Sequence, residues 1–288
     1  MTIKQKIFVV FKLFLKKIFT LNIFLKIYML KENFFKIYIK KKNYPKILND
    51  GFKIPLIVHQ SWVDNNFPQT IGKKILSFRN LNTDIQFNLY NNSDVCNFMK
   101  KFYKNHEIFQ IFKRAKFWQM KADIFRYCVV YEKGGFWFDI KSGVNNQLSN
   151  ILDTKSDMLI SFEGNKRIIK KKNTSNKLQH PKNWICNWGF AARKKCRVLK
   201  NQINNICKYF KFYEGKTFKD PKIAILELTG PRMFTHTIVN ELKKKNSIRI
   251  QQVGVDFNNL GIYAHSGADV LWRKIRHYSQ YQNTKIIN

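Results

Sequence analysis

From residue 51 onward, hydrophobic and polar positions follow two different periods along this chain. Short apolar runs, which are typical of buried strands, are separated by longer stretches in which apolar residues recur every three or four positions, as in amphipathic helices. We predict strands at 54–58, 86–90, 136–138, 158–162 and 188–192, and helices at 71–79, from Ser93 or Asp94 to Tyr103, at 118–132 and at 195–209. This alternation predicts an α/β fold with a doubly wound, mostly parallel sheet.

The first 50 residues have a different pattern. Lysines interrupt their Phe, Ile and Leu residues every few positions, so no run approaches the roughly 20 apolar residues that a membrane-spanning helix needs. A signal peptide also fits poorly, because no small-residue cleavage site follows. The pattern favours a basic helical extension, lying on an anionic membrane surface or packed as a hairpin on the rest of the chain. Pro45 and the turn at 49–51 mark the boundary between this extension, 1–50, and one domain, 51–288.

The composition is strongly basic, with 53 Lys and Arg residues against 18 Asp and Glu residues and a formal net charge of +35. Such a charge attracts nucleic acid, anionic lipid or phosphorylated molecules. The lysines are spread along the whole chain and no nucleic-acid recognition motif is present, so we regard a nucleic-acid-binding protein as the weaker interpretation. The five cysteines are odd in number and contain no Cys-x-x-Cys pair. This favours a reducing, cytoplasmic compartment over a disulfide framework or a zinc site.

Residues 121–144 carry the strongest indication of a functional site. A predicted helix with Asp123 and Arg126 on one face runs into the Gly134-Gly135 turn, and a short apolar strand then ends on Asp139. A strand that carries a carboxylate to its C-terminal end is a common way for an α/β sheet to present charge to a ligand. The paired glycines allow close approach of a phosphate or a sugar. The alternative is an ordinary connection in which Asp123 and Arg126 form a surface ion pair of little consequence.

In this stretch the chain resembles glycosyltransferase family 32, the family of the yeast initiating α-1,6-mannosyltransferase and of the inositol-phosphoceramide mannosyltransferases. The family core reads approximately [SA]-D-x-x-R-[YF]…Y-x-x-G-G-[IV]-Y-x-D-x-D. Matching positions here are Ala122-Asp123, Arg126-Tyr127, Tyr131, Gly134-Gly135, Trp137 and Asp139. Two further segments agree in order: IPLIVHQSW at 54–62 is similar to the opening I-P-K-x-I-H-Q-x-W, and LTGP at 228–231 is similar to the T-G-P segment. The resemblance covers residues 54–240 approximately.

The resemblance implies a single GT-A-like catalytic domain that transfers a hexose, such as mannose, glucose or galactose, with retention. The expected donor is a UDP- or GDP-hexose and the expected acceptor a glycan or a lipid-linked glycan. An enzyme of this kind would be cytoplasmic and peripheral to the membrane that carries its acceptor. In the family, the acid and arginine corresponding to Asp123 and Arg126 serve the donor sugar, because a carboxylate accepts and a guanidinium donates hydrogen bonds.

Other candidates for donor binding follow from the same motifs. Trp62 follows the first predicted strand and can stack on the base, or it is a core aromatic at the rim. The amide groups from Gly230 onward begin a helix and can bind an anion. The full set of predicted donor-binding residues is His59, Gln60, Trp62, Gly134, Gly135, Trp137, Thr229, Gly230, Pro231 and, in a C-terminal tail that closes over the donor in related enzymes, His277.

One position departs from the family pattern. Lys141 stands where the family has the second acid of its D-x-D motif, so the local charge changes by two units. In the usual motif the two acids hold Mg²⁺ or Mn²⁺ against the nucleotide diphosphate. Either a divalent cation, Mn²⁺ or Mg²⁺, is retained on Asp139 with ligands from the C-terminal segment, or Lys141 partly neutralises the leaving diphosphate. A third interpretation is a catalytically silent relative that binds only glycans or partners.

Overall fold

The computed structural model describes residues 35–45, 51–164, 175–263 and 278–288. Its centre is a seven-stranded sheet in the order β11-β8-β9-β6-β3-β5-β2. The sheet strands are β2 (Lys42–Asn43), β3 (Ile57–Ser61), β5 (Gln86–Tyr90), β6 (Gly135–Phe138), β8 (Met158–Phe162), β9 (Ile185–Ala192) and β11 (Ile250–Val255). Strands β11, β8, β6, β3 and β5 run in one direction, and β9 and β2 run in the other. The predicted α/β fold with a mostly parallel sheet is confirmed.

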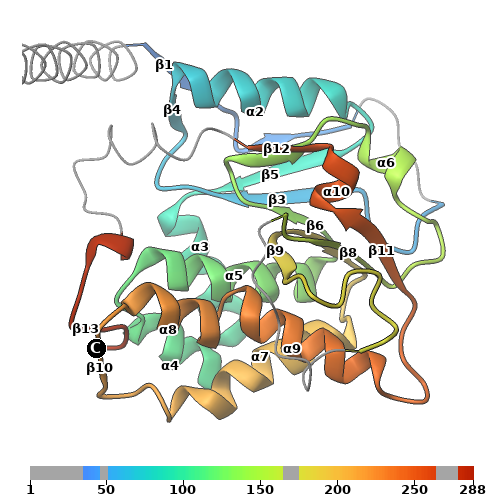
Figure 1. Cartoon of the computed structure of the whole chain (residues 1–288). Coiled ribbons are helices and arrows are strands. Elements are labelled where there is room, and N and C mark those ends of the chain that lie inside the picture. The colour runs from blue at the N-terminus through green and yellow to red at the C-terminus, as the bar shows by residue number, and fades with distance from the viewer. Residues whose placement is uncertain (1–34, 46–50, 165–174, 264–277) are drawn as a thin grey trace, which may run out of the picture.

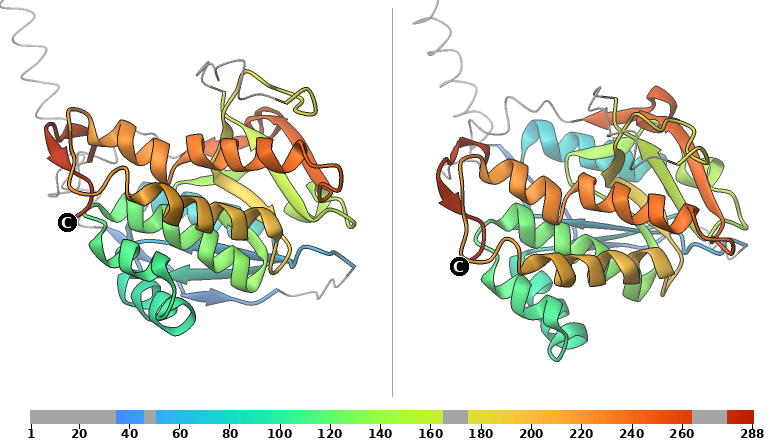
Figure 2. Two further views of the ribbon diagram at one scale, coloured as in Figure 1. Left: turned by 90° about the horizontal axis from the view of Figure 1, so that it is seen from below. Right: turned by 60° about the horizontal axis from the view of Figure 1, so that its bottom comes forward.

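Helices cover both faces of this sheet (Figure 1). One face carries α3 (Asn92–Tyr103), α4 (Glu107–Arg114), α5 (Trp118–Lys133), α7 (Arg197–Phe210), α8 (Pro221–Leu228) and α9 (Pro231–Leu242). Figure 2 shows α7, α8 and α9 as one layer on this face. The other face carries α2 (Gln69–Leu81), α6 (Leu148–Ile151) and the turn α10 (Asp256–Asn259). Short strands complete the fold: β1 (Lys36–Tyr38) with β4 (Asn66–Pro68), β7 (Ser142–Val144) with β12 (Gly261–Tyr263), and β10 (Thr217–Phe218) with β13 (Thr284–Lys285).

The central strand β6 shows why both faces are covered. All four of its residues are buried. Trp137 points into the cluster made with α5 and α7, while Phe136 and Phe138 point into the opposite cluster with α2. Because successive side chains of a strand point to opposite faces, an uninterrupted apolar strand needs cover on both sides. Asp139 is therefore the first polar residue after a fully buried strand.

Most predicted elements are present, and the first strand is shifted. The strand predicted at 54–58 forms as β3, Ile57–Ser61, so His59 and Gln60 lie inside it instead of just beyond it. Pro55 supplies no N–H group to a sheet ladder, and its carbonyl oxygen accepts a bond from the Ile57 amide in a tight turn. The strand therefore begins after the proline.

The described part of the predicted extension, residues 35–45, is not helical. It forms β1 and β2, and β2 pairs antiparallel with β5 at the edge of the main sheet. Ile39, between these strands, is fully buried. These residues therefore belong to the α/β domain, which begins before the predicted boundary at residue 51. The remaining extension lies outside the described residues. Within the described residues we find no helix with the length and apolar character needed to span a bilayer.

Candidate functional site

Asp139 lies at the C-terminal end of β6, at the edge where β3 and β5 also end. Arg126 donates to its Oδ1 atom at 2.8 Å, and the indole Nε1 of Trp137 donates to the same atom at 2.8 Å. The Asp139 side chain is 40% exposed. Both donors fall on Oδ1 of this partly exposed carboxylate and hold the side chain in one orientation. Neither of these donors contacts the other oxygen, Oδ2.

Arg126 lies between two carboxylates. Its second terminal nitrogen is 2.7 Å from Oδ1 of Asp123, and the side chains of Arg126 and Asp123 are only 5% and 11% exposed. The alternative of a surface ion pair is therefore wrong. The guanidinium also lies over the ring of Trp137, 5.5 Å from its centroid. The side chains of Asp123, Arg126, Trp137 and Asp139, which we call the acid-arginine array, form one connected unit beneath the sheet edge.

Three other side chains hold Asp123 in place. Thr229 donates from its hydroxyl to Asp123 Oδ2 at 3.0 Å, and Asn187 donates to Asp123 Oδ1 at 3.4 Å. Asn187 also donates to the Tyr127 hydroxyl, which in turn donates to the backbone oxygen of Thr229. We did not predict a role for Asn187 or Tyr127. The available signals were a lone amide in the otherwise apolar β9 strand and a tyrosine beside the arginine of the core motif.

Burial and neighbouring charges shift the pKa values of Asp123 and Arg126 in opposite directions. Burial raises the pKa of Asp123 to about 6, although the neighbouring Arg126 cation lowers it. Burial alone would lower the pKa of Arg126, but the carboxylates of Asp139 and Asp123 outweigh burial and raise it. Arg126 therefore stays charged, and Asp123 takes up a proton at a higher pH than an exposed aspartate does.

The T-G-P segment has a different role from the predicted one. Thr229 is fully buried and its hydroxyl is bonded to Asp123. The Gly230 amide already donates to the backbone oxygen of Ile225 at 3.0 Å, and Pro231 has no N–H group. A Cβ atom at Gly230 would lie 2.7 Å from the Leu226 backbone. Gly230 and Pro231 therefore offer no free N–H group to an anion, and Thr229 of this segment binds Asp123.

His59 is 1% exposed, and both of its ring nitrogens are used inside the protein. Nε2 lies 3.0 Å from the backbone oxygen of Gly134, which can only accept, so Nε2 donates. Nδ1 then accepts from the Tyr90 hydroxyl at 3.1 Å. Burial lowers the pKa of His59 to about 4, which keeps the ring neutral at physiological pH. The prediction that His59 contacts the donor is therefore replaced by a structural role that connects β3, β5 and the end of α5.

The Gly134-Gly135 pair also has a structural role. Gly134 ends α5 with φ +70°, and Gly135 begins β6 with φ +98°, a conformation that favours glycine. A Cβ atom at Gly135 would lie 2.3 Å from the Ile57 carbonyl oxygen. Both glycines lie at the N-terminal end of β6, whereas Asp139 follows its C-terminal end. The prediction that they approach the donor is therefore wrong. The two glycines instead allow α5 and β6 to pack closely against β3.

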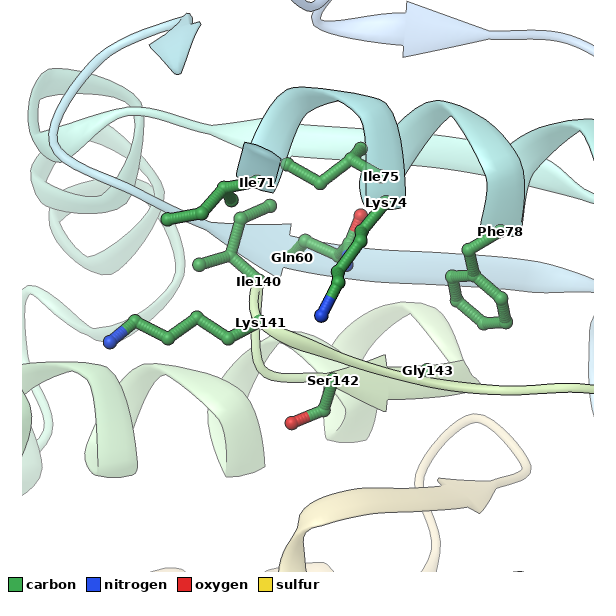
Figure 3. A pocket seen from close by; sticks show the side chains of 9 residues that line it. All are labelled: Gln60, Ile71, Lys74, Ile75, Phe78, Ile140, Lys141, Ser142 and Gly143. Atoms are coloured by element: carbon green, nitrogen blue, oxygen red, sulfur yellow. The ribbon is translucent and has the colours of Figure 1, made fainter. Parts of the chain in front are cut away.

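Beside Asp139, the loop that contains Lys141 faces the segment that contains Trp62. Trp62 stacks on Phe67 with centroids 5.8 Å apart, and the Lys141 ammonium lies 5.9 Å from the Trp62 ring centroid. Gln60, at 1% exposure, forms part of a hollow between α2 and this loop (Figure 3). The lining residues are Gln60, Ile71, Lys74, Ile75, Phe78, Ile140, Lys141, Ser142 and Gly143.

The described residues do not match the usual metal-binding arrangement of the family. Among them we find no group of three or more His, Cys, Asp or Glu side chains placed to hold a metal ion. Oδ1 of Asp139 already accepts from Arg126 and Trp137, and Lys141 brings an ammonium where a second acid would supply oxygen ligands. His277, predicted to contact the donor, lies outside the described residues.

Comparison with known proteins identifies a related region in this part of the chain. Residues 68–158 match a family model described as "glycosyltransferase sugar-binding region containing DXD motif", and this range includes the helix and strand that carry the acid-arginine array. The fold and the matched region thus resemble those of glycosyltransferases with a GT-A-like α/β fold. The chain is 27% identical over 161 residues to inositol phosphoceramide mannosyltransferase 1 of Schizosaccharomyces pombe, over 54% of this chain and 44% of that protein. The chain is therefore similar to members of glycosyltransferase family 32, as its motifs predicted.

The chain thus spans less than half the length of that relative. Among solved structures, the PaToxG glycosyltransferase has a TM-score of 0.49 and 16% identity, over 66% of this chain and 70% of that one. The ligand-free glycosyltransferase domain from the YGT toxin also has a TM-score of 0.49, with 9% identity, over 73% of this chain and 82% of that one.

Proposed function

We propose that this protein transfers a hexose from a nucleotide-sugar donor to a glycan or glycolipid acceptor, with retention of configuration at the transferred carbon. One observation carries the proposal: the acid-arginine array presents a half-exposed, oriented Asp139 at the C-terminal edge of the sheet, within the matched sugar-binding region. Open α/β sheets bind ligands at that edge. Retention follows from the resemblance alone. No nucleophile is assigned, so we infer no double displacement.

The array's residues have different parts in this proposal. Asp139 contacts the donor through Oδ2. Arg126 and Trp137 act as positioning residues because both of their contacts fall on Oδ1 and both side chains are buried. Asp123, buried and bonded to Thr229, keeps the guanidinium aligned. Such fixed placement of charge supplies electrostatic stabilisation without reorganisation at the moment of reaction.

The related mannosyltransferase suggests the first substrates to test. The name of that enzyme specifies mannose transfer to inositol phosphoceramide, so GDP-mannose with a lipid-linked acceptor is our preferred pair, ahead of UDP-glucose and UDP-galactose. The formal net charge of +35 supports contact with an anionic membrane surface that carries such an acceptor. We propose a cytoplasmic protein peripheral to that membrane.

The test is a transfer assay with each nucleotide hexose and a lipid-linked acceptor in vesicles, in EDTA and in Mn²⁺. We expect transfer with one donor and its loss in Asp139→Asn, which keeps the side-chain shape and removes the charge. Asp64→Asn is the matched control, because Asp64 is an exposed turn residue. Unchanged transfer in Asp139→Asn would remove the central assignment. Donor binding without transfer to any acceptor would instead favour the catalytically silent relative that the substitution by Lys141 suggests.

A further inference from the structure

The hollow shown in Figure 3 lies beside Asp139 and is lined on its charged side only by lysines. Lys74 descends from α2 and Lys141 extends from the loop that follows Asp139, and the apolar side chains of Ile71, Ile75 and Ile140 line the same hollow. No acidic side chain belongs to the lining. The hollow therefore combines two positive charges with an apolar lining.

Gln60 supplies an independent indication of a ligand. It belongs to β3, is 1% exposed and lines the hollow. Its Oε1 atom has no hydrogen-bond partner within the part of the chain that the structure describes. A buried acceptor without a donor costs about 1–3 kcal/mol, so proteins rarely leave one unused. A hydroxyl group of a ligand in the hollow would satisfy it.

The two lysines match the charge that the family's metal normally supplies. Two ammonium groups carry the same formal positive charge as one divalent cation. Because Lys141 stands in place of the second acid, one of the two carboxylates that would hold that cation is absent. The negative charge with which that carboxylate would repel a diphosphate is therefore absent as well. Lysine is a compact charge on a flexible stem, so Lys74 and Lys141 can adjust to two neighbouring phosphate groups although their stems leave the hollow in different directions (Figure 3).

We propose that this hollow is a diphosphate subsite in which Lys74 and Lys141 neutralise the donor's phosphate groups without a divalent cation, while Gln60 accepts a hydrogen bond from a hydroxyl of the same ligand. This inference rests on the proposed function and specifies how that site binds its donor. It makes Lys74, which no motif singles out, a binding residue. It also explains how a lysine at position 141 is compatible with donor binding.

The experiment is calorimetric titration of the full chain with UDP, GDP and inorganic pyrophosphate, each in EDTA and in Mn²⁺. We expect wild-type protein to bind a nucleoside diphosphate in EDTA, with the Kd unchanged by Mn²⁺. Lys74→Met and Lys141→Met should each weaken this binding by roughly ten- to a hundredfold, since a hydrogen bond to a charged group contributes about 1.5–3 kcal/mol. Lys74→Arg retains the charge and should retain binding.

Two further variants sharpen the test. Lys73→Met is the matched control, because Lys73 is the exposed neighbour of Lys74 on α2 and does not line the hollow. Its Kd should equal that of wild type. Lys141→Asp restores the family's second acid, so binding in EDTA should fall further than in Lys141→Met and should increase when Mn²⁺ is added. Circular dichroism and the Tm of each variant establish that it is folded.

The outcomes separate this inference from the proposed function. Wild-type binding that EDTA abolishes and Mn²⁺ restores would overturn the lysine subsite and leave the proposed transfer standing. Equal Kd values for Lys74→Met and Lys73→Met would do the same. If neither nucleoside diphosphate binds in either condition, both the subsite and the proposed function fail.

Discussion

Removal of Arg126 tests whether the acid-arginine array is a buried unit. Arg126→Met keeps most of the aliphatic stem and removes the cation that faces both Asp123 and Asp139. Asp139 is 40% exposed and can recover water, but Asp123 is 11% exposed and keeps only its bonds to neutral Thr229 and Asn187. The variant therefore leaves a carboxylate buried without an opposing charge.

The structure gives the expected magnitude. Breaking a buried ion pair by removing one partner costs about 3–5 kcal/mol. The side chains of Arg126 and Asp123 are 5% and 11% exposed, so solvent screening does not reduce this figure. In a domain of this size each 1 kcal/mol lowers Tm by about 2–4 °C, so we expect a fall of roughly 6–20 °C.

The pH dependence has a definite sign. The pKa of Asp123 is already raised to about 6 by burial, and loss of Arg126 raises it further. A carboxyl group with a raised folded-state pKa contributes stability that is present below its unfolded-state pKa and lost as pH rises through the folded-state value. The destabilisation of Arg126→Met relative to wild type should therefore be larger at about pH 8 than at about pH 5.

Urea unfolding at both pH values, followed by circular dichroism, measures these effects. The double variant Asp123→Asn, Arg126→Met removes the uncompensated charge and should regain about 1–3 kcal/mol relative to Arg126→Met. Arg249→Met is the matched control, because the Arg249 and Asp153 side chains of its ion pair are 56% and 36% exposed and such pairs contribute about 0–1 kcal/mol. If Arg126→Met costs no more than Arg249→Met, the reasoning about the buried array is wrong.

Two other variants test neighbouring features. Trp137→Phe keeps a ring in the core but deletes the N–H group that binds Asp139, so kcat should fall roughly tenfold for a loss of about 1–1.5 kcal/mol. The smaller ring also leaves a cavity in the core and should lower Tm. A folded variant with unchanged kcat would contradict a positioning role. Gly135→Ala introduces a Cβ atom 2.3 Å from a carbonyl oxygen of β3 at φ +98° and should lower the free energy of unfolding by more than about 2 kcal/mol. Gly164→Ala should be nearly neutral, because a Cβ atom there would meet only an ordinary 3.8 Å contact. Similar free energies of unfolding for the two alanine variants would argue against the packing explanation.

Elements with a strong local pattern could be predicted from the sequence. Strands at 86–90 and 158–162 have the predicted limits, and α5 runs from Trp118 to Lys133 against a prediction of 118–132. In these segments, apolar periodicity and the terminating glycine specify the backbone without reference to distant residues. The pairing of Asp123 with Arg126 was likewise predictable, because residues three apart share a helix face. Its burial was not, since burial depends on what packs against that face.

By itself, the sequence determined the α/β class, the family resemblance and the place of Asp139 at the end of a buried strand, because each is encoded in short, contiguous patterns. Only the tertiary structure decided which motif residues face a ligand. His59 turns inward to Gly134 because strand register fixes the face on which each side chain lies. Thr229 binds Asp123 across 106 positions of sequence, and Lys74 of α2 lines the same hollow as Lys141 of the loop between β6 and β7. Such contacts join residues that are far apart in the chain. They form only when folding brings the sheet edge and the helices together.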